Sequence, residues 1–141
     1  MSEILVNKLT GTSTAGSILV TGEGNSTTTN LQQGLAKVWV NINQDGTQAV
    51  RGSNNVSSIA DEGTGATQTN LTSATADANY ALAGTVGDEG GNSGCWHTTG
   101  FNQNSYNTSN TTSSFHQQTY YATTSVADTG FVYCTLHGDL A

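Results

Sequence analysis

Two cysteine–histidine pairs are the residues with the clearest potential for chemistry. Cys95 and His97 form the first pair, and Cys134 and His137 form the second. Two thiolates and two imidazoles are a ligand set that zinc accepts. On a strand, Cys95 and His97 share a face, but Cys134 and His137 are three residues apart and point to opposite faces unless a bulge intervenes. We therefore favour two buried thiols and two ordinary histidines, and we expect no metal ion or other cofactor.

The same two cysteines could instead form a disulfide with each other. A chain without a secretion signal usually keeps its thiols reduced, and buried free cysteines are common. Both alternatives stay open at this point.

Catalytic patterns are weak in this chain. The carboxylate pairs Asp61-Glu62 and Asp88-Glu89 lie in glycine-flanked turns, where solvated charge is the usual role. Ser and Thr are so abundant that a Ser/His/Asp triple carries no information without geometry. There is no Gly-x-Ser-x-Gly elbow, phosphate loop or dinucleotide fingerprint. We therefore expect that the protein is not an enzyme.

A polar segment with isolated aromatics is the best candidate for ligand contact. Residues 100–113 read GFNQNSYNTSNTTS. Aromatic rings supply contact area and amides supply adaptable hydrogen bonds, as in binding loops, although a plain surface excursion fits the same composition. Trp96, just before this segment, is a possible aromatic platform for a sugar. The contact residues that we expect are Trp96, Phe101, Asn102, Tyr106 and Asn107.

The elements that would position these residues begin at a change of periodicity in residues 28–43. Leu31, Leu35 and Val38 fall at i, i+4 and i+7, which predicts one stripe of a short helix over residues 29–38, capped by Thr29 or Asn30. From Val38 onward apolar and other residues alternate, which predicts a strand. So short a helix is marginal alone, and its stripe needs either a coiled-coil-like partner or the sheet of its own domain.

Residues 39–141 are predicted to form an antiparallel β-sandwich, because short alternating runs are separated by Asp-Gly and Gly-rich turns. Residues 1–28 form a Gly/Thr/Ser-rich extended segment with brief apolar runs. The predicted strands are 38–42, 47–51, 56–59, 68–72, 80–86, 95–99, 114–123 and 131–137. The predicted core residues are Trp39, Ile42, Val50, Val56, Ile59, Leu71, Tyr80, Leu82, Val86, Phe115, Val126, Phe131, Tyr133 and Leu136.

Composition narrows the class of protein. Hydrophobic residues make up 34% of the 141 residues and charged residues 9%, against roughly 45–50% and about 25% in typical globular domains. Backbone pairing and subunit contacts must supply what a large core would otherwise supply, which favours an oligomeric β protein. Three basic against ten acidic residues argue against nucleic-acid binding. No apolar run is long enough to span a bilayer and no signal peptide is visible, so we expect a soluble chain without membrane insertion.

Several stretches resemble small fibre-like proteins of marine tailed bacteriophages, especially cyanophages. The opening SEILVNKL (residues 2–9) is similar to the start of such appendage proteins, and LQQGLAKVW (residues 31–39) is similar to their link between stem and knob. NVSSI (55–59), ANYALAGT (78–85) and the terminal GDLA (138–141) resemble strands and the end of that knob. His137 departs from the pattern, where an aromatic is more usual, and the region around Cys95 and the 100–113 segment matches nothing in it.

The resemblance implies a homotrimeric, mainly β virion protein, assembled in the host cytoplasm. It implies an N-terminal attachment stem (1–28) that contacts other tail or capsid proteins, a collar helix (29–38) and an outward-facing β-sandwich knob (39–141). Leu31, Leu35 and Val38 are then expected around a threefold axis. The knob would contact a host-surface glycan or protein. Two alternatives remain: a capsid-decorating or cement trimer without a receptor role, and a stand-alone carbohydrate-binding module.

Overall fold

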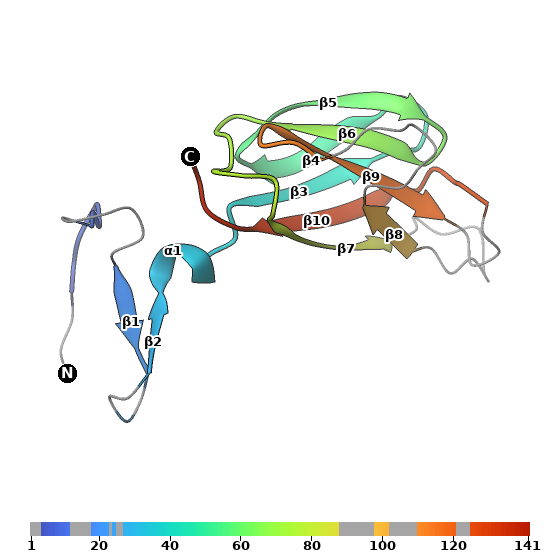
Figure 1. The fold of residues 1–141 in the computed structure, drawn as a ribbon. Helices are drawn as coiled ribbons and strands as arrows, with labels where there is room; N and C mark the ends of the chain where they lie inside the picture. The colour runs from blue at the N-terminus through green and yellow to red at the C-terminus, as the bar shows by residue number, and fades with distance from the viewer. Residues whose placement is uncertain are drawn as a thin grey trace. The chain divides into compact units, whose positions relative to one another are not determined.

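The chain divides into two units, Met1–Leu35 and Ala36–Ala141. The computed structural model describes residues 4–11, 18–22, 24, 27–87, 98–101, 110–120 and 125–141. Most described residues with regular structure lie in antiparallel strands (Figure 1), which confirms the predicted mainly β, antiparallel class.

The first unit contains a small hairpin followed by one helical turn. Strands β1 (Leu19–Thr21) and β2 (Thr28–Asn30) pair antiparallel, and α1 (Leu31–Gly34) follows directly. The Asn30 side chain caps α1 by accepting hydrogen bonds from the backbone N–H groups of Gln32 (2.8 Å) and Gln33 (3.2 Å). The cap was anticipated, but the helix is much shorter than the expected 29–38. Beyond Gly34 the backbone is extended at Leu35, and the chain then enters a strand.

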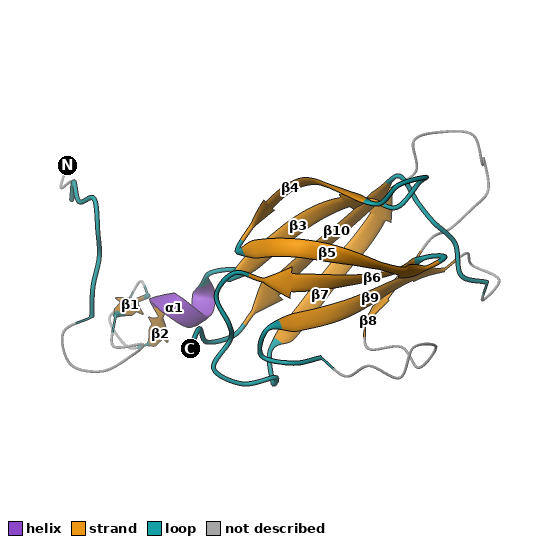
Figure 2. Ribbon diagram, turned by 90° about the horizontal axis from the view of Figure 1, so that it is seen from above, coloured by secondary structure: helices purple, strands orange, loops and turns teal. Residues whose placement is uncertain are grey.

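The second unit consists of two four-stranded antiparallel sheets (Figure 2). One sheet has the order β4-β3-β10-β7 and the other β5-β6-β9-β8. Residues 95–97 and 121–123 of the predicted strands lie outside the described residues. All eight predicted strands overlap observed strands, and 131–137 matches both ends of β10. Their bounds are β3 (Val38–Asn43), β4 (Ala49–Asn54), β5 (Val56–Gly63), β6 (Ala66–Leu71), β7 (Ala81–Gly87), β8 (Thr98–Phe101), β9 (Ser114–Tyr120) and β10 (Phe131–His137).

The chain passes from one sheet to the other at Asn55, between β4 and β5. Asn55 has a φ of 59°, a left-handed conformation that Asn tolerates better than most residues. Its side chain also accepts a hydrogen bond from the Ser73 N–H (2.7 Å) and donates one to the Ser73 carbonyl (3.0 Å). These two hydrogen bonds therefore connect the point where the chain changes sheets, Asn55, to Ser73 in the segment that follows β6.

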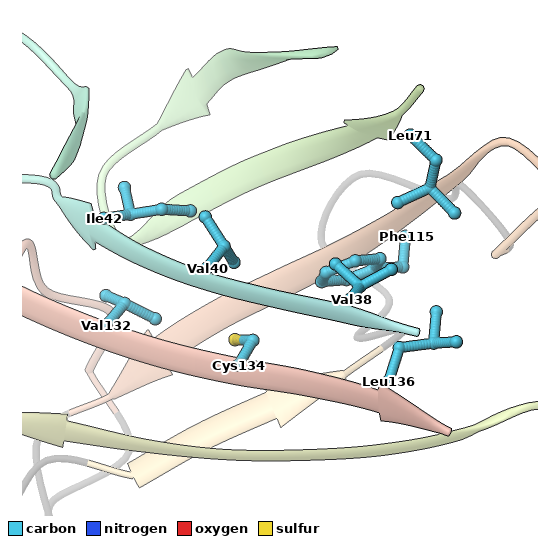
Figure 3. Packing of buried hydrophobic residues seen from close by; sticks show 8 residues of the cluster. All are labelled: Val38, Val40, Ile42, Leu71, Phe115, Val132, Cys134 and Leu136. Carbon is cyan, nitrogen blue, oxygen red and sulfur yellow. The ribbon is translucent and has the colours of Figure 1, made fainter. Parts of the chain in front are cut away.

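The apolar core lies between the two sheets (Figure 3). Eight buried side chains form it, of which β3 and β10 supply six. They are Val38, Val40, Ile42, Leu71, Phe115, Val132, Cys134 and Leu136. The partly buried Val56, Ile59, Tyr80, Leu82 and Val86 pack against them.

Four predicted core residues are instead exposed on the surface: Trp39, Val50, Val126 and Tyr133. On β3 the smaller residues Val38, Val40 and Ile42 point inward, so Trp39 must point outward. The same alternation on β10 buries Val132, Cys134 and Leu136 and places Tyr133 outside. The predicted alternation was correct, and Ile42 and Leu136 are buried as predicted. The error was to place Trp39 and Tyr133, from the opposite face of the same two strands, in the core as well.

One end of the interior is polar rather than apolar. Gln44, expected in a surface turn, is buried, and its Nε2 donates to Thr67 Oγ1 (3.0 Å). Thr67 Oγ1 in turn donates to Gln48 Oε1 (2.6 Å), and Gln48 Nε2 donates to Asp61 Oδ1 (2.9 Å). Thr119 Oγ1 lies 2.9 Å from Gln44 Oε1. This chain of hydrogen bonds links the β3–β4 turn of one sheet to β6 and β9 of the other, and it satisfies groups whose burial would otherwise be costly.

Candidate functional site

Most of the predicted contact residues fall outside the part of the chain that the structure describes. Trp96, Asn102, Tyr106 and Asn107 lie outside the described residues, and Phe101 is the last residue of β8. The described end of the 100–113 segment contacts β9, because Asn110 Oδ1 accepts a hydrogen bond from the His116 backbone N–H (3.1 Å). The Tyr80 hydroxyl lies 2.9 Å from the carbonyl oxygen of Thr111, and burial raises the pKa of Tyr80 to about 12.

The two described members of the possible zinc ligand set, Cys134 and His137, do not lie on the same face of their strand. Cys95 and His97 lie outside the described residues. Cys134 is buried on the inner face of β10, whereas His137 is exposed on the same strand. Within the described residues, no group of three or more His, Cys, Asp or Glu side chains is placed to hold a metal ion. Cys134 is a free thiol that donates to Gln117 Oε1 at 3.1 Å, so it does not form the alternative disulfide.

Burial raises the pKa of Cys134 to about 12, from an ordinary value of 9.0. The thiolate is the reactive form, and in this range each pKa unit lowers its population about tenfold. In a Cys95→Ser variant, we expect Cys134 to react with a maleimide at pH 8 about a thousandfold more slowly than a peptide thiol. The rate should become normal in denaturant. Labelling of the folded variant at the peptide rate would show that the thiol is not enclosed.

The residues expected around a threefold axis lie in different environments. Leu31 is half-buried in α1, and Leu35 is 55% exposed just after it. Val38 is fully buried in the core of the second unit, because it begins β3 and pairs with Leu136 of β10. Val38 therefore cannot contact a neighbouring copy, and we withdraw it from the predicted axis. Leu31 and Leu35 stay predictions.

The most distinctive surface is the outer face of the β4-β3-β10-β7 sheet. Trp39 on β3 is 47% exposed and Tyr133 on β10 is 40% exposed, with Phe131 partly exposed two residues before Tyr133. Thr135 pairs with Trp39, and Tyr133 pairs with Asn41, so Trp39 and Tyr133 are diagonal neighbours on one face. We call Trp39, Phe131 and Tyr133 the aromatic row.

The rings of the aromatic row are held in place by their neighbours. Phe131 and Tyr133 stack with ring centroids 5.9 Å apart and planes 8° apart. The Arg51 guanidinium carbon lies 4.3 Å from the Phe131 ring centroid, and Arg51 Nε donates to the Gly130 carbonyl (3.2 Å). A cation over an aromatic face is attractive, so Arg51 restrains the ring that supports Tyr133.

Two glycines lie against the rings. A Cβ at Gly52 would be 3.4 Å from the six-membered ring of Trp39, and one at Gly87 would be 3.7 Å from ring carbons of both Phe131 and Tyr133, which are ordinary contact distances. Trp39 therefore leans over β4, while Phe131 and Tyr133 lean over β7. Each ring rests on backbone on one side and keeps part of its surface open to solvent.

The strands that carry and flank the aromatic row are polar on this face. The four strands of this sheet contain no Asp or Glu, although the whole chain has a formal charge of −7. Asn41 lies beside Tyr133, and its Oδ1 is buried without a hydrogen-bond partner. The arrangement can bind a ligand that offers both apolar surface and hydroxyl groups.

The sequence carried a signal for this face that our predictions used wrongly. The alternation in residues 38–43 and 131–137 places Trp39, Phe131 and Tyr133 together on one side of their strands. The prediction missed this shared face because it placed all three large aromatic residues in the core.

Comparison with known proteins gives no family for this chain. No family model, curated protein or solved structure matches it. Among the described residues, no helix is long and apolar enough to cross a membrane.

A second polar cluster lies on the outer face of the other sheet. His116 on β9 is buried, and its Nδ1 lies 2.8 Å from Glu62 Oε2 on β5. Glu62 was expected to be a solvated turn residue, but β5 continues through it to Gly63. The contact bridges β5 and β9 across the intervening strand β6, and so it fastens three strands of one sheet together.

Proposed function

We propose that this protein is a non-enzymatic virion structural protein that forms a trimeric fibre or knob on a phage particle and contributes to host attachment. In this proposal the first unit attaches the protein to the particle and to its own copies, and the sandwich projects. The resemblance to fibre-like proteins of marine tailed phages motivates it. The single observation that carries it is the exposure of most large apolar side chains among the described residues of the first unit.

The first unit has no buried residue among those described. Ile18 and Leu31 are partly buried, but seven other large apolar side chains of this unit are exposed. A two-stranded hairpin with so little burial is marginally stable at best in water. Stability therefore requires that other chains cover these side chains. They are Ile4, Leu5, Val6, Leu9, Leu19, Val20 and Leu35.

The distribution of charge favours association through this unit. Glu3, Lys8 and Glu23 are the only charged residues among the first 35, which gives a formal charge of −1. Residues 36–141 carry the remaining −6 of the total −7. Copies that meet through the first unit bring little charge together, whereas copies that meet through the acidic unit would repel one another.

Light scattering of the full chain should give a mass three times the chain mass of 14.5 kDa. Leu35→Asn should weaken the trimer, so that dilution releases monomers at higher concentration than for the natural chain. Val50→Asn is the matched control, because Val50 is also exposed but lies on β4 in the sandwich. A natural chain that stays monomeric at micromolar concentration would contradict the trimer.

Immunogold labelling of purified particles tests the virion role separately. Labels confined to the tail would support attachment, and labels over the whole capsid would favour the decoration role. Particles without label would refute the proposed function.

A further inference from the structure

We propose that the aromatic row, Trp39, Phe131 and Tyr133, is a binding site for a neutral pyranose oligosaccharide. The biological meaning of this inference rests on the proposed attachment function, whose ligand class it names. The site itself is built within the sandwich, so it can be tested without reference to the virion.

The rings are preorganised for stacking. Phe131 contacts both the Arg51 guanidinium and the Tyr133 ring, and Trp39 and Tyr133 lie against Gly52 and Gly87. A ligand therefore orders few side chains when it binds, which removes part of the entropic cost of association. Pyranose rings present apolar C–H faces that stack on such rings.

The size of the aromatic row fits a short glycan better than a protein partner. A fully buried aromatic side chain removes about 150–250 Å² from water, and less than half of each of these three rings is exposed. Together they offer at most about 300 Å², well below the roughly 800 Å² that each partner buries in a standard protein interface. The neighbouring outer positions add little, because β7 places Ala81, Ala83 and Thr85 there.

The polar groups around the aromatic row fit a ligand rich in hydroxyls. Asn41 pairs with Tyr133 and Thr135 pairs with Trp39, and Asn41 Oδ1 has no hydrogen-bond partner. A hydroxyl, either direct or through a water molecule, would satisfy that acceptor after a small side-chain rotation.

The charge of the face excludes two other classes of ligand. Nucleic acids also stack on aromatics, but their phosphates need a row of basic residues, and Arg51 is the only Lys or Arg on these four strands. Cationic glycans would need carboxylates, which the four strands lack. A neutral sugar needs neither.

The test is binding of the full-length protein to an array of neutral glucan, galactan and mannan oligosaccharides, with uronic-acid and sulfated oligosaccharides alongside. We expect binding to at least one neutral series. Trp39→Ala and Tyr133→Ala should each weaken that binding at least about tenfold, measured by calorimetry with the best-bound neutral oligosaccharide. Trp39→Phe and Tyr133→Phe keep a ring and should retain most of the affinity.

Val126→Ala is the matched control, because Val126 is exposed but lies outside the four strands. It should bind like the natural chain, and circular dichroism should show that every variant is folded. No binding to any neutral series, binding to acidic glycans alone, or binding that neither alanine variant weakens would overturn the site.

The two proposals fail in different ways. A change of oligomeric mass in Trp39→Ala would identify the aromatic row as a subunit contact and overturn the glycan site alone. If the natural chain binds glycan but is monomeric, the trimer is overturned and the site stands. If it binds glycan but is absent from particles, the virion role is overturned and the site stands.

Discussion

Replacing Phe115 with alanine is expected to lower the free energy of unfolding by about 3–5 kcal/mol, the range for truncating a buried aromatic. Phe115 is 0% exposed and is the only aromatic among the eight buried core residues. It lies on β9 and packs against side chains of the opposite sheet (Figure 3). Its removal leaves a cavity at the contact between the sheets, which close-packed neighbours cannot fill.

Urea unfolding at a fixed protein concentration, followed by circular dichroism, measures this loss. The concentration must be held constant because association contributes to apparent stability. Tyr133→Ala serves as the comparison, since its exposed ring lies outside the core and should cost much less. A loss below about 1 kcal/mol for Phe115→Ala would contradict the packing described here.

Gly65→Ala is expected to lower the free energy of unfolding about as much as Phe115→Ala does, although it adds only one methyl group. Gly65 has a φ of +68°, and a Cβ there would lie 2.8 Å from both the Thr119 and Ala127 carbonyl oxygens. The backbone N–H of Thr119 also donates to the Gly65 carbonyl (2.9 Å), so the turn cannot move away without breaking that contact. The left-handed conformation costs about 1–2 kcal/mol and the overpacking about 1–3 kcal/mol. We expect a total loss of about 2–5 kcal/mol.

Gly46→Ala is the matched control, because it separates the two contributions. Gly46 has nearly the same φ, +69°, but a Cβ there would meet no atom within 4 Å. It should therefore lose only the conformational part, about 1–2 kcal/mol. Equal losses at the two glycines, measured by thermal and urea unfolding, would show that the backbone around Gly65 is not tightly packed.

Local patterns were enough to place the strands. Alternation at 131–137 and 38–42 predicted β10 and β3 to within one residue at each end. The Asn-Gln-Asp-Gly sequence at residues 43–46 predicted the turn between β3 and β4. These signals are local, because side chains alternate across any strand and the left-handed turn at Gly46 favours glycine. The helix cap was predicted at Thr29 or Asn30 from the same kind of local signal, and the structure selects Asn30.

The helix length could not be read from its spacing. Leu31, Leu35 and Val38 match a helical stripe, but Val38 also begins the alternation of β3. Pairing with Leu136 of β10, far along the chain, decides between the two patterns. Tertiary contacts override local propensity where both are weak.

The sequence by itself determined the β class, the positions of the strands along the chain, most of the turns and which side chains share a face of a strand. The tertiary structure alone decided which face is inside. Val38, Val40 and Ile42 fill the space between the sheets, and so Trp39, Phe131 and Tyr133 form the aromatic row outside. Alternation is a property of one strand, whereas burial depends on what the opposite sheet presents. For the same reason, only the fold could bring Gln44 to Thr67 and Thr119 in the polar end of the interior.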